Sequence, residues 1–186
     1  MARLQYSINV TLDGCCDHAA IVPYPEMHQF WSDIVGNSSG LYGRVTYKMM
    51  EEAWRPIAES GHAPDGTPDW VVPFARSIHA AKKFVVSNTL TEVDWNAELL
   101  KGDLKAEIER IKREHEGIIS LGGLTLAREI AALGLIDDYI FLVHPRIVGH
   151  GPTLFSGLPA PLDLTLKDQR TFSSGAIALT YEAKRS

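Results

Sequence analysis

Apolar and polar residues alternate in three parts of the chain, and this period of two predicts β-strands. The first part is residues 4–10, and the other two are residues 162–172 and 176–183. Only Ser173-Ser174-Gly175 separates the last two, so they predict an antiparallel hairpin at the C-terminal end.

Short apolar runs and helical patterns follow one another between these strands. Strands are predicted at 40–42, 83–88, 117–121 and 136–145, with a short extended piece at 91–96. Helices are predicted at 26–35, from 44 onward, at 70–80, at 102–116 and from 124 to a stop at Gly134, while 54–69 is expected to be irregular. The repeated strand–helix order predicts the α/β class, with a mixed, mostly parallel central sheet flanked by helices in one domain, 1–186.

Composition narrows the function classes. The chain has 186 residues, of which 45% are hydrophobic and 22% charged, and its net charge of −5 argues against a nucleic-acid partner. No apolar run reaches the roughly 18 residues of a membrane span, and no signal-peptide pattern opens the chain, so a cytoplasmic protein is expected. Cys15 and Cys16 are adjacent and no spaced Cys/His set exists, so we expect neither a disulfide nor a metal site.

Three segments suit an anionic ligand. Gly122-Gly123 and Gly43 each separate a strand from a helix, and such a turn points free N–H groups and a positive helix end at a ligand. Arg44 in a first helical turn and Thr46 beside it suggest a phosphate clamp, although a solvated arginine is the alternative. Ser87-Asn88 ends a strand, where either ligand binding or turn capping fits equally.

Other side chains leave two interpretations open. Met27, Phe30 and Trp31 lie on one helical face, which is either core or the wall of a pocket for a planar ligand. His144 and His150 stand near a strand end and in a glycine-rich loop, where a structural role is more common than a catalytic one.

The ordered set of these motifs resembles the dihydrofolate-reductase-like superfamily. More narrowly, it resembles the branch that contains the C-terminal reductase domain of the bifunctional riboflavin-biosynthesis deaminase–reductase. The resemblance covers essentially the whole chain and rests on segments 11–14, 41–47, 85–90, 121–123 and 145–155.

This resemblance implies a dihydrofolate-reductase-like fold with NADPH in the cleft. It implies cofactor contacts from the following residues: Thr11, Gly43, Arg44, Thr46, Ser87, Asn88, Leu121, Gly122, Gly123 and Leu124. It also implies a loop after Thr11 that covers the nicotinamide, with Asp13 as the catalytic residue that orients a substrate hydroxyl.

One position departs from the folate-reducing branch. The helix acid that grips a pteridine there is replaced by Met27, and Glu26 lies about 100° round the helix. Because a pterin edge needs that carboxylate, folate reduction is disfavoured. The expected function is therefore a stand-alone NADPH-dependent reductase similar to 5-amino-6-(5-phosphoribosylamino)uracil reductase, with Met27, Phe30 and Trp31 in the substrate pocket.

Two alternatives to that function stay open. One is a nitro-, quinone- or carbonyl-type reductase on the same fold, because a fold does not fix a substrate. The other is a nucleotide- or drug-binding module without turnover. Related reductases are often dimers, so a homodimer is expected, with a small molecule as substrate.

Overall fold

The computed structural model describes residues 1–184, and all of its strands belong to one sheet. The strands are β1 (Arg3–Thr11), β2 (Ser38–Gly43), β3 (Lys83–Val86), β4 (Ala97–Leu100), β5 (Ile118–Leu121), β6 (Asp138–His144), β7 (Leu164–Thr171) and β8 (Ile177–Ala183). The helices are η1 (His18–Ala20), α1 (Pro25–Gly36), α2 (Arg44–Ser60), α3 (Val71–Ala80), α4 (Leu104–Glu114) and α5 (Thr125–Ala132). The single domain predicted for 1–186 stays a prediction, and its last two residues lie outside the described part.

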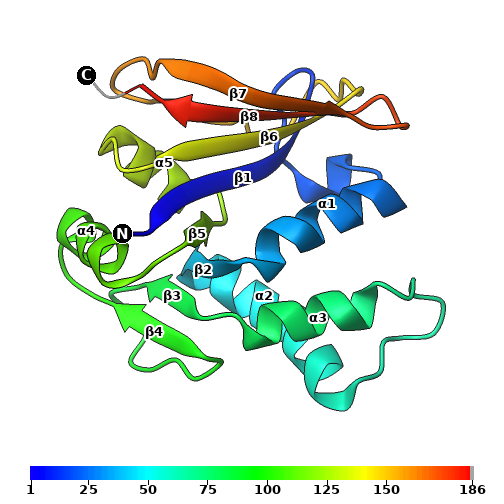
Figure 1. Cartoon of the computed structure of the whole chain (residues 1–186), viewed down its shortest axis with the longest axis horizontal. Coiled ribbons are helices and arrows are strands. Elements are labelled where there is room, and N and C mark those ends of the chain that lie inside the picture. Colours follow the sequence, from blue (N-terminus) through cyan, green and yellow to red (C-terminus); the bar gives the residue numbers. More distant parts are fainter. Residues whose placement is uncertain (185–186) are drawn as a thin grey trace.

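The eight strands lie in the order β4-β3-β2-β5-β1-β6-β8-β7. Every neighbouring pair from β4 to β6 is parallel, whereas β8 is antiparallel to both β6 and β7. Figure 1 shows the sheet running from β4 at the bottom to β7 at the top. The predicted mixed, mostly parallel sheet with a terminal hairpin is therefore confirmed.

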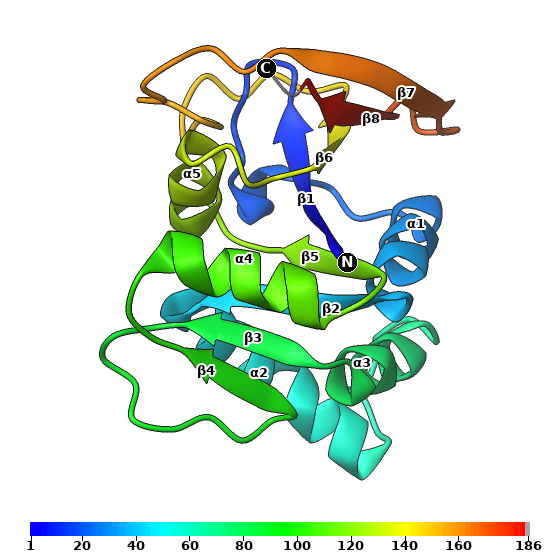
Figure 2. The same cartoon turned by 60° about the vertical axis from the view of Figure 1, so that its left-hand side comes forward.

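Helices cover both faces of the sheet (Figures 1 and 2). On one face α4 and α5 pack against strand side chains such as Tyr6, Leu41 and Ile119, all of which are buried. On the other face α2 and α3 pack against Tyr42 and Val85, and α1 packs toward β6 and β8. Burying apolar side chains on both faces stabilises the sheet and fixes the ends of its strands in space.

Two boundaries differ from the sequence prediction. The segment 54–69, expected to be irregular, begins as the second half of α2, which continues through Pro56 to Ser60. Arg55 holds this part together because its guanidinium pairs with Glu51 at 2.7 Å and Glu59 at 2.9 Å, one turn away on each side. The helix then ends at Gly61, whose φ of 70° is left-handed.

The extended piece predicted at 91–96 is also wrong in position. The strand in this region is β4, which begins at Ala97, just after the predicted piece. Asn96 has a φ of 46°, which turns the chain just before β4. Trp95, at the end of the predicted piece, is buried, and its indole Nε1 donates to His79 Nδ1 at 3.0 Å. Among the described residues, none of the helices has the length and apolar character needed to cross a membrane.

Candidate functional site

Two helices begin side by side at the carboxyl ends of neighbouring strands. Helix α2 starts directly after Gly43 of β2, and α5 starts after Gly122, Gly123 and Leu124, which follow β5. Strands β2 and β5 are paired, with Leu41 opposite Leu121. Neither helix has a side-chain cap or an acidic residue in its first turn. The first turns of both helices therefore carry no negatively charged side chain, and the nearest carboxylate that lines the same cavity is Glu129, one turn further along α5.

A cavity of about 540 Å³ lies at these two helix starts, and we call it the anion cavity. It is lined by six of the ten residues predicted to bind cofactor: Gly43, Arg44, Thr46, Gly122, Gly123 and Leu124. Arg44 is exposed there and forms no ion pair with any residue in the described range 1–184. An unpaired cation between two helix N-termini suits an anionic ligand.

The two glycines after β5 stand where a side chain would collide with its neighbours. A Cβ on Gly123, whose φ is 91°, would lie 2.7 Å from Thr46 Oγ1, and a Cβ on Gly122 would lie 3.0 Å from the Tyr42 ring. Side chains at these two positions would therefore collide with the protein, and the glycines that replace them line the anion cavity. A glycine turn of this kind lets an anionic group approach the backbone closely.

A second cavity, of about 630 Å³, adjoins the first, and we call it the aromatic cavity. Thr46, Gly122 and Gly123 line both, and Leu121 lines only the aromatic one. Its other walls come from β1, β2, α1, α2 and α3 with the residue before it, and they carry the large rings of Trp31, Tyr42, Trp54, Trp70 and Phe74. A ligand that spans both cavities would have its charge at the helix ends and its flat part among these rings.

Two of the three residues predicted for the substrate pocket line the aromatic cavity. Met27 and Trp31 line it, while their predicted contact with a substrate stays a prediction. Phe30 does not, because its ring packs edge-on against Phe172 at 5.5 Å, on the flank of α1 that faces the C-terminal hairpin. Glu26 also faces away, since its carboxylate accepts hydrogen bonds from Ser173 N at 3.0 Å and Ser173 Oγ at 2.5 Å. No acid on α1 therefore lines the cavity, in line with the argument against folate reduction.

Ser87 and Asn88 have the turn-capping geometry, which was one of the two interpretations left open. Ser87 Oγ accepts hydrogen bonds from Thr89 N at 3.2 Å and Leu90 N at 3.1 Å. Asn88 Oδ1 accepts from Gly102 N at 3.4 Å. Neither residue lines the anion cavity. The residue of β3 that lines it is Val86, the last one of the strand. Their predicted contact with the cofactor stays a prediction.

Thr11 and Asp13 lie apart from both cavities. Asp13 accepts hydrogen bonds from Thr11 Oγ1 at 2.5 Å, from Val148 N at 3.2 Å and from Gly149 N at 2.7 Å. These donors lower the pKa of the Asp13 carboxyl, the Thr11 hydroxyl having the largest effect. The carboxylate thus ties the turn after β1 to the loop after β6. The catalytic role of Asp13 and the cofactor contact of Thr11 remain predictions that this geometry does not favour.

Among the residues of the aromatic cavity that the sequence did not predict are His28 and Asn9. His28 lies flat on Trp70, with 3.6 Å between ring centroids and 18° between planes, and burial lowers the His28 pKa. Asn9 of β1 lines the same cavity. The helical spacing from His28 to Trp31 and Val35 could have revealed His28, but Trp70 stands in a segment without a clear pattern.

The two histidines considered for chemistry differ in environment. His144 is buried, and its Nε2 lies 2.9 Å from Asn9 Oδ1, while burial lowers its pKa. His150 is exposed in the loop after β6 and lines neither cavity.

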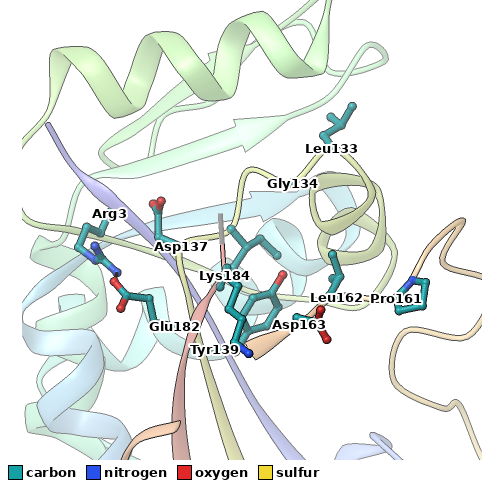
Figure 3. Close-up of a pocket in the computed structure, with 12 residues that line it drawn as sticks. Arg3, Leu133, Gly134, Asp137, Tyr139, Pro161, Leu162, Asp163, Glu182 and Lys184 are labelled. Atoms are coloured by element: carbon teal, nitrogen blue, oxygen red, sulfur yellow. Dashed lines mark hydrogen bonds and ion pairs between the residues drawn. The ribbon is translucent and has the colours of Figure 1, made fainter. Parts of the chain in front are cut away.

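A third cavity, of about 550 Å³, lies at the opposite end of β1 and β6 (Figure 3). Three of the charged side chains that line it are ion-paired: Arg3 contacts Asp138 at 2.7 Å and Glu182 at 2.9 Å, and Asp137 contacts Lys112 at 2.6 Å. Asp163 and Lys184 line it as well, so this cavity carries a mixture of acidic and basic side chains.

Comparison with known proteins decides the family. Residues 41–178 match the RibD C-terminal domain, and this range includes every residue of the anion cavity. The chain belongs to that family. The family match and the structural relatives confirm the resemblance to riboflavin-biosynthesis reductases of dihydrofolate-reductase-like fold. Membership of this family indicates an oxidoreductase.

Three relatives illustrate the match. The uncharacterized protein YyaP of Bacillus subtilis is 29% identical over 143 residues, which are 76% of this chain and 71% of YyaP. A putative riboflavin biosynthesis protein from Shewanella sp. PV-4 aligns with a TM-score of 0.70 and 20% identity over 100% of both chains. A diaminohydroxyphosphoribosylaminopyrimidine deaminase/5-amino-6-(5-phosphoribosylamino)uracil reductase from Thermotoga maritima aligns with a TM-score of 0.65 and 16% identity, over 98% of this chain and 57% of that one.

Proposed function

We propose that this protein is an NADPH-dependent reductase that acts on a small molecule in the aromatic cavity. The observation that carries the proposal is the meeting of two uncapped helix N-termini and unpaired Arg44 at one cavity, directly beside an aromatic one. A dinucleotide with an extra phosphate has the matching chemistry: several phosphates at one end and a flat ring at the other.

Each part of this chain would have a defined task. The backbone N–H groups after Gly43 and Gly122 would hold the pyrophosphate, and the Arg44 guanidinium would bind the 2′-phosphate. Bound NADPH would supply the hydride. The rings of Trp31, Trp70 and Phe74 would exclude water and hold the acceptor close, which supplies much of the reduction in barrier.

The test measures cofactor affinity by calorimetry with NADPH and NADH. For Arg44→Ala we expect NADPH to bind roughly 10- to 100-fold more weakly, because one charge-assisted contact is lost, and NADH to change little. Lys48→Ala is the matched control, since Lys48 is an exposed cation one turn along α2 that does not line the anion cavity. Equal loss of both cofactors, or no loss of NADPH, would contradict the proposal.

Turnover separates the reductase from a binding module. NADPH consumption with neutral quinones, nitroaromatics and aryl ketones is followed by absorbance. A protein that binds NADPH through Arg44 but consumes none of it with any acceptor class would be a binding module of the same fold.

A further inference from the structure

The chemistry of the aromatic cavity says which molecules can enter it. We infer that the substrate of the proposed reductase is an uncharged, flat aromatic molecule with a carbonyl oxygen, and that Asn9 is the residue that selects it by donating a hydrogen bond to that oxygen. This inference rests on the proposed function for its meaning as a substrate, but its test measures binding alone.

Among the residues that the structure describes, the wall of the aromatic cavity carries no acidic side chain and no lysine or arginine. All the described residues that line the aromatic cavity are apolar, aromatic or neutral polar, apart from two histidines, and none is Asp, Glu, Lys or Arg. An anionic group buried there would lose its hydration and find no cation in exchange, which disfavours its binding. A flat neutral ring meets Trp31, Trp70 and Phe74 instead, and stacks on them favourably.

The histidines and the tyrosine of the wall do not add a charge that would favour an anionic ligand. His28 is held neutral at pH 7 because burial between α1 and α3 lowers its pKa. Burial likewise raises the pKa of Tyr42 to about 12, so its hydroxyl is neutral too. His18 of η1 is the remaining titratable group, and its side chain is almost fully exposed to solvent, 3.6 Å from Asp17.

The orientation of the Asn9 amide is fixed by its neighbours. Trp31 Nε1 lies 3.2 Å from one end of this amide, and an indole N–H can only donate. The atom that faces Trp31 must therefore be the oxygen, Asn9 Oδ1, and the same oxygen lies 2.9 Å from His144 Nε2. Because Oδ1 accepts there, His144 carries its proton on Nε2.

The N–H donors of the Asn9 amide remain available to a ligand. With Oδ1 fixed by two donors from α1 and β6, the two N–H donors of Asn9 Nδ2 cannot exchange places with the oxygen. Within residues 1–184 Nδ2 donates to no protein group, and Nδ2 is not one of the buried atoms that lack a partner. Since Asn9 lines the aromatic cavity, its donors are open to a ligand there. A carbonyl oxygen is the acceptor that a neutral aromatic ligand would offer.

This cavity differs in charge from what its relatives' names suggest. The Thermotoga maritima protein is described as a reductase of a phosphoribosylamino-uracil. In this chain β1 and α1, which supply Asn9, Met27, His28 and Trp31, lie before the range 41–178 that matches the family. Asn9 and the α1 side of the wall thus come from residues that the family match does not cover, whereas Trp70 and Phe74 lie within it.

The test uses three probes of one shape and measures binding by calorimetry, to the protein alone and to the protein saturated with NADP⁺. The probes are 2-acetylnaphthalene, its hydrocarbon isostere 2-isopropylnaphthalene and its anionic isostere 2-naphthoate. At pH 7 we expect the ketone to bind at least roughly 100-fold more tightly than the carboxylate, because the carboxylate finds no cation.

Variants of Asn9 test the second half of the inference. In Asn9→Leu, which keeps the size of the side chain, the ratio of ketone affinity to hydrocarbon affinity should fall by roughly 10-fold, while hydrocarbon affinity stays the same. Asn9→Asp keeps an acceptor for Trp31 and His144 but removes the amide donors, so it should lose the same selectivity even if the leucine variant fails to fold. Gln29→Leu is the control, since it makes a comparable amide-to-leucine change on the exposed side of α1.

Each outcome has one meaning. Carboxylate binding as tight as ketone binding, or no ketone binding in either form of the protein, overturns the inference about substrate class. A ketone preference that survives both Asn9 variants overturns the role of Asn9. Loss of the NADPH result for Arg44, with the probe result intact, overturns the proposed function and leaves a site for neutral aromatic ketones.

Discussion

His28 links the aromatic cavity to pH through a single ring. It is stacked on Trp70, and burial lowers its pKa from the ordinary value of 6.5. A neutral ligand in the cavity would remove His28 further from water and so favour its uncharged form. We expect affinity for 2-acetylnaphthalene to be constant at and above about pH 7 and to fall as the pH drops below 6.5. Calorimetry across this range measures the effect.

Two variants assign this pH dependence. His28→Phe keeps a ring against Trp70 but removes the titration, so its affinity should no longer change with pH. His18→Gln removes the other histidine of the cavity and should keep the wild-type slope. A slope that persists in His28→Phe and disappears in His18→Gln would assign the effect to η1 instead.

Single residues were predictable where one local rule determines their place. Gly43, Gly122 and Gly123 could be placed at turns between a strand and a helix from the local sequence, and these turns line one cavity; their role in binding an anion stays a prediction. Asn9 could not, because its role depends on partners from α1 and β6 that are distant in sequence. The environment of Asp13 could not be predicted either, because two of its hydrogen-bond donors come from the loop after β6, which is distant in sequence.

Asp13 matters for how two loops hold together. Its carboxylate joins the turn after β1 to Val148 and Gly149, and hydrogen bonds from the Thr11 hydroxyl first, then from these amides, lower its pKa. For Asp13→Asn we expect faster amide hydrogen exchange at 148–149, by roughly 10-fold, because the amide offers only one acceptor oxygen. NADPH affinity and kcat should change by less than about 3-fold, since Asp13 lines neither cavity.

The control for this variant is Asp17→Asn. Asp17 accepts a hydrogen bond from Ala19 N at the start of η1, a few residues further along, and does not contact the 148–149 backbone. Its substitution should leave exchange at 148–149 unchanged. If Asp13→Asn instead lost most of its kcat with unchanged exchange, the catalytic role predicted from the sequence would be correct.

Whole elements were predictable where their pattern is local and long. The α1 face and the β7–β8 hairpin follow from periods of 3.6 and 2. Helix α2 is predicted too short because Pro56 usually marks a break, whereas the helix continues past it, with Arg55 paired to Glu51 and Glu59 across this point. Strand β4 was misplaced because its position depends on pairing with β3 rather than on its own sequence.

At the scale of the molecule, the order of the sheet creates the site. Strand β5 lies between β2 and β1, so the turn after Leu121 comes beside the turn after Tyr42 although α2, α3 and α4 intervene in the chain. Periodicity gives strands but not their order. The resemblance to a known fold implied the order, and with it the meeting of the two glycine turns.

The same order leaves β7 at the edge of the sheet. From Thr165 to Thr171 every residue of this strand is exposed, including Leu166 at 48%. An exposed edge strand is a surface for pairing with another chain, and the homodimer predicted from sequence stays a prediction that this strand can test. We expect sedimentation of the wild-type protein to show a dimer, and Leu166→Lys to raise its dissociation constant at least about 10-fold.

The control is Ile147→Lys, which places the same charge on a side chain that is 73% exposed in the loop after β6 and should leave the dimer intact. Because no residue of β7 lines the anion or the aromatic cavity, the monomeric variant should bind NADPH as the wild type does. A wild-type protein that sediments as a monomer would contradict the dimer. A dimer that Leu166→Lys leaves intact would instead place its interface away from the β7 edge.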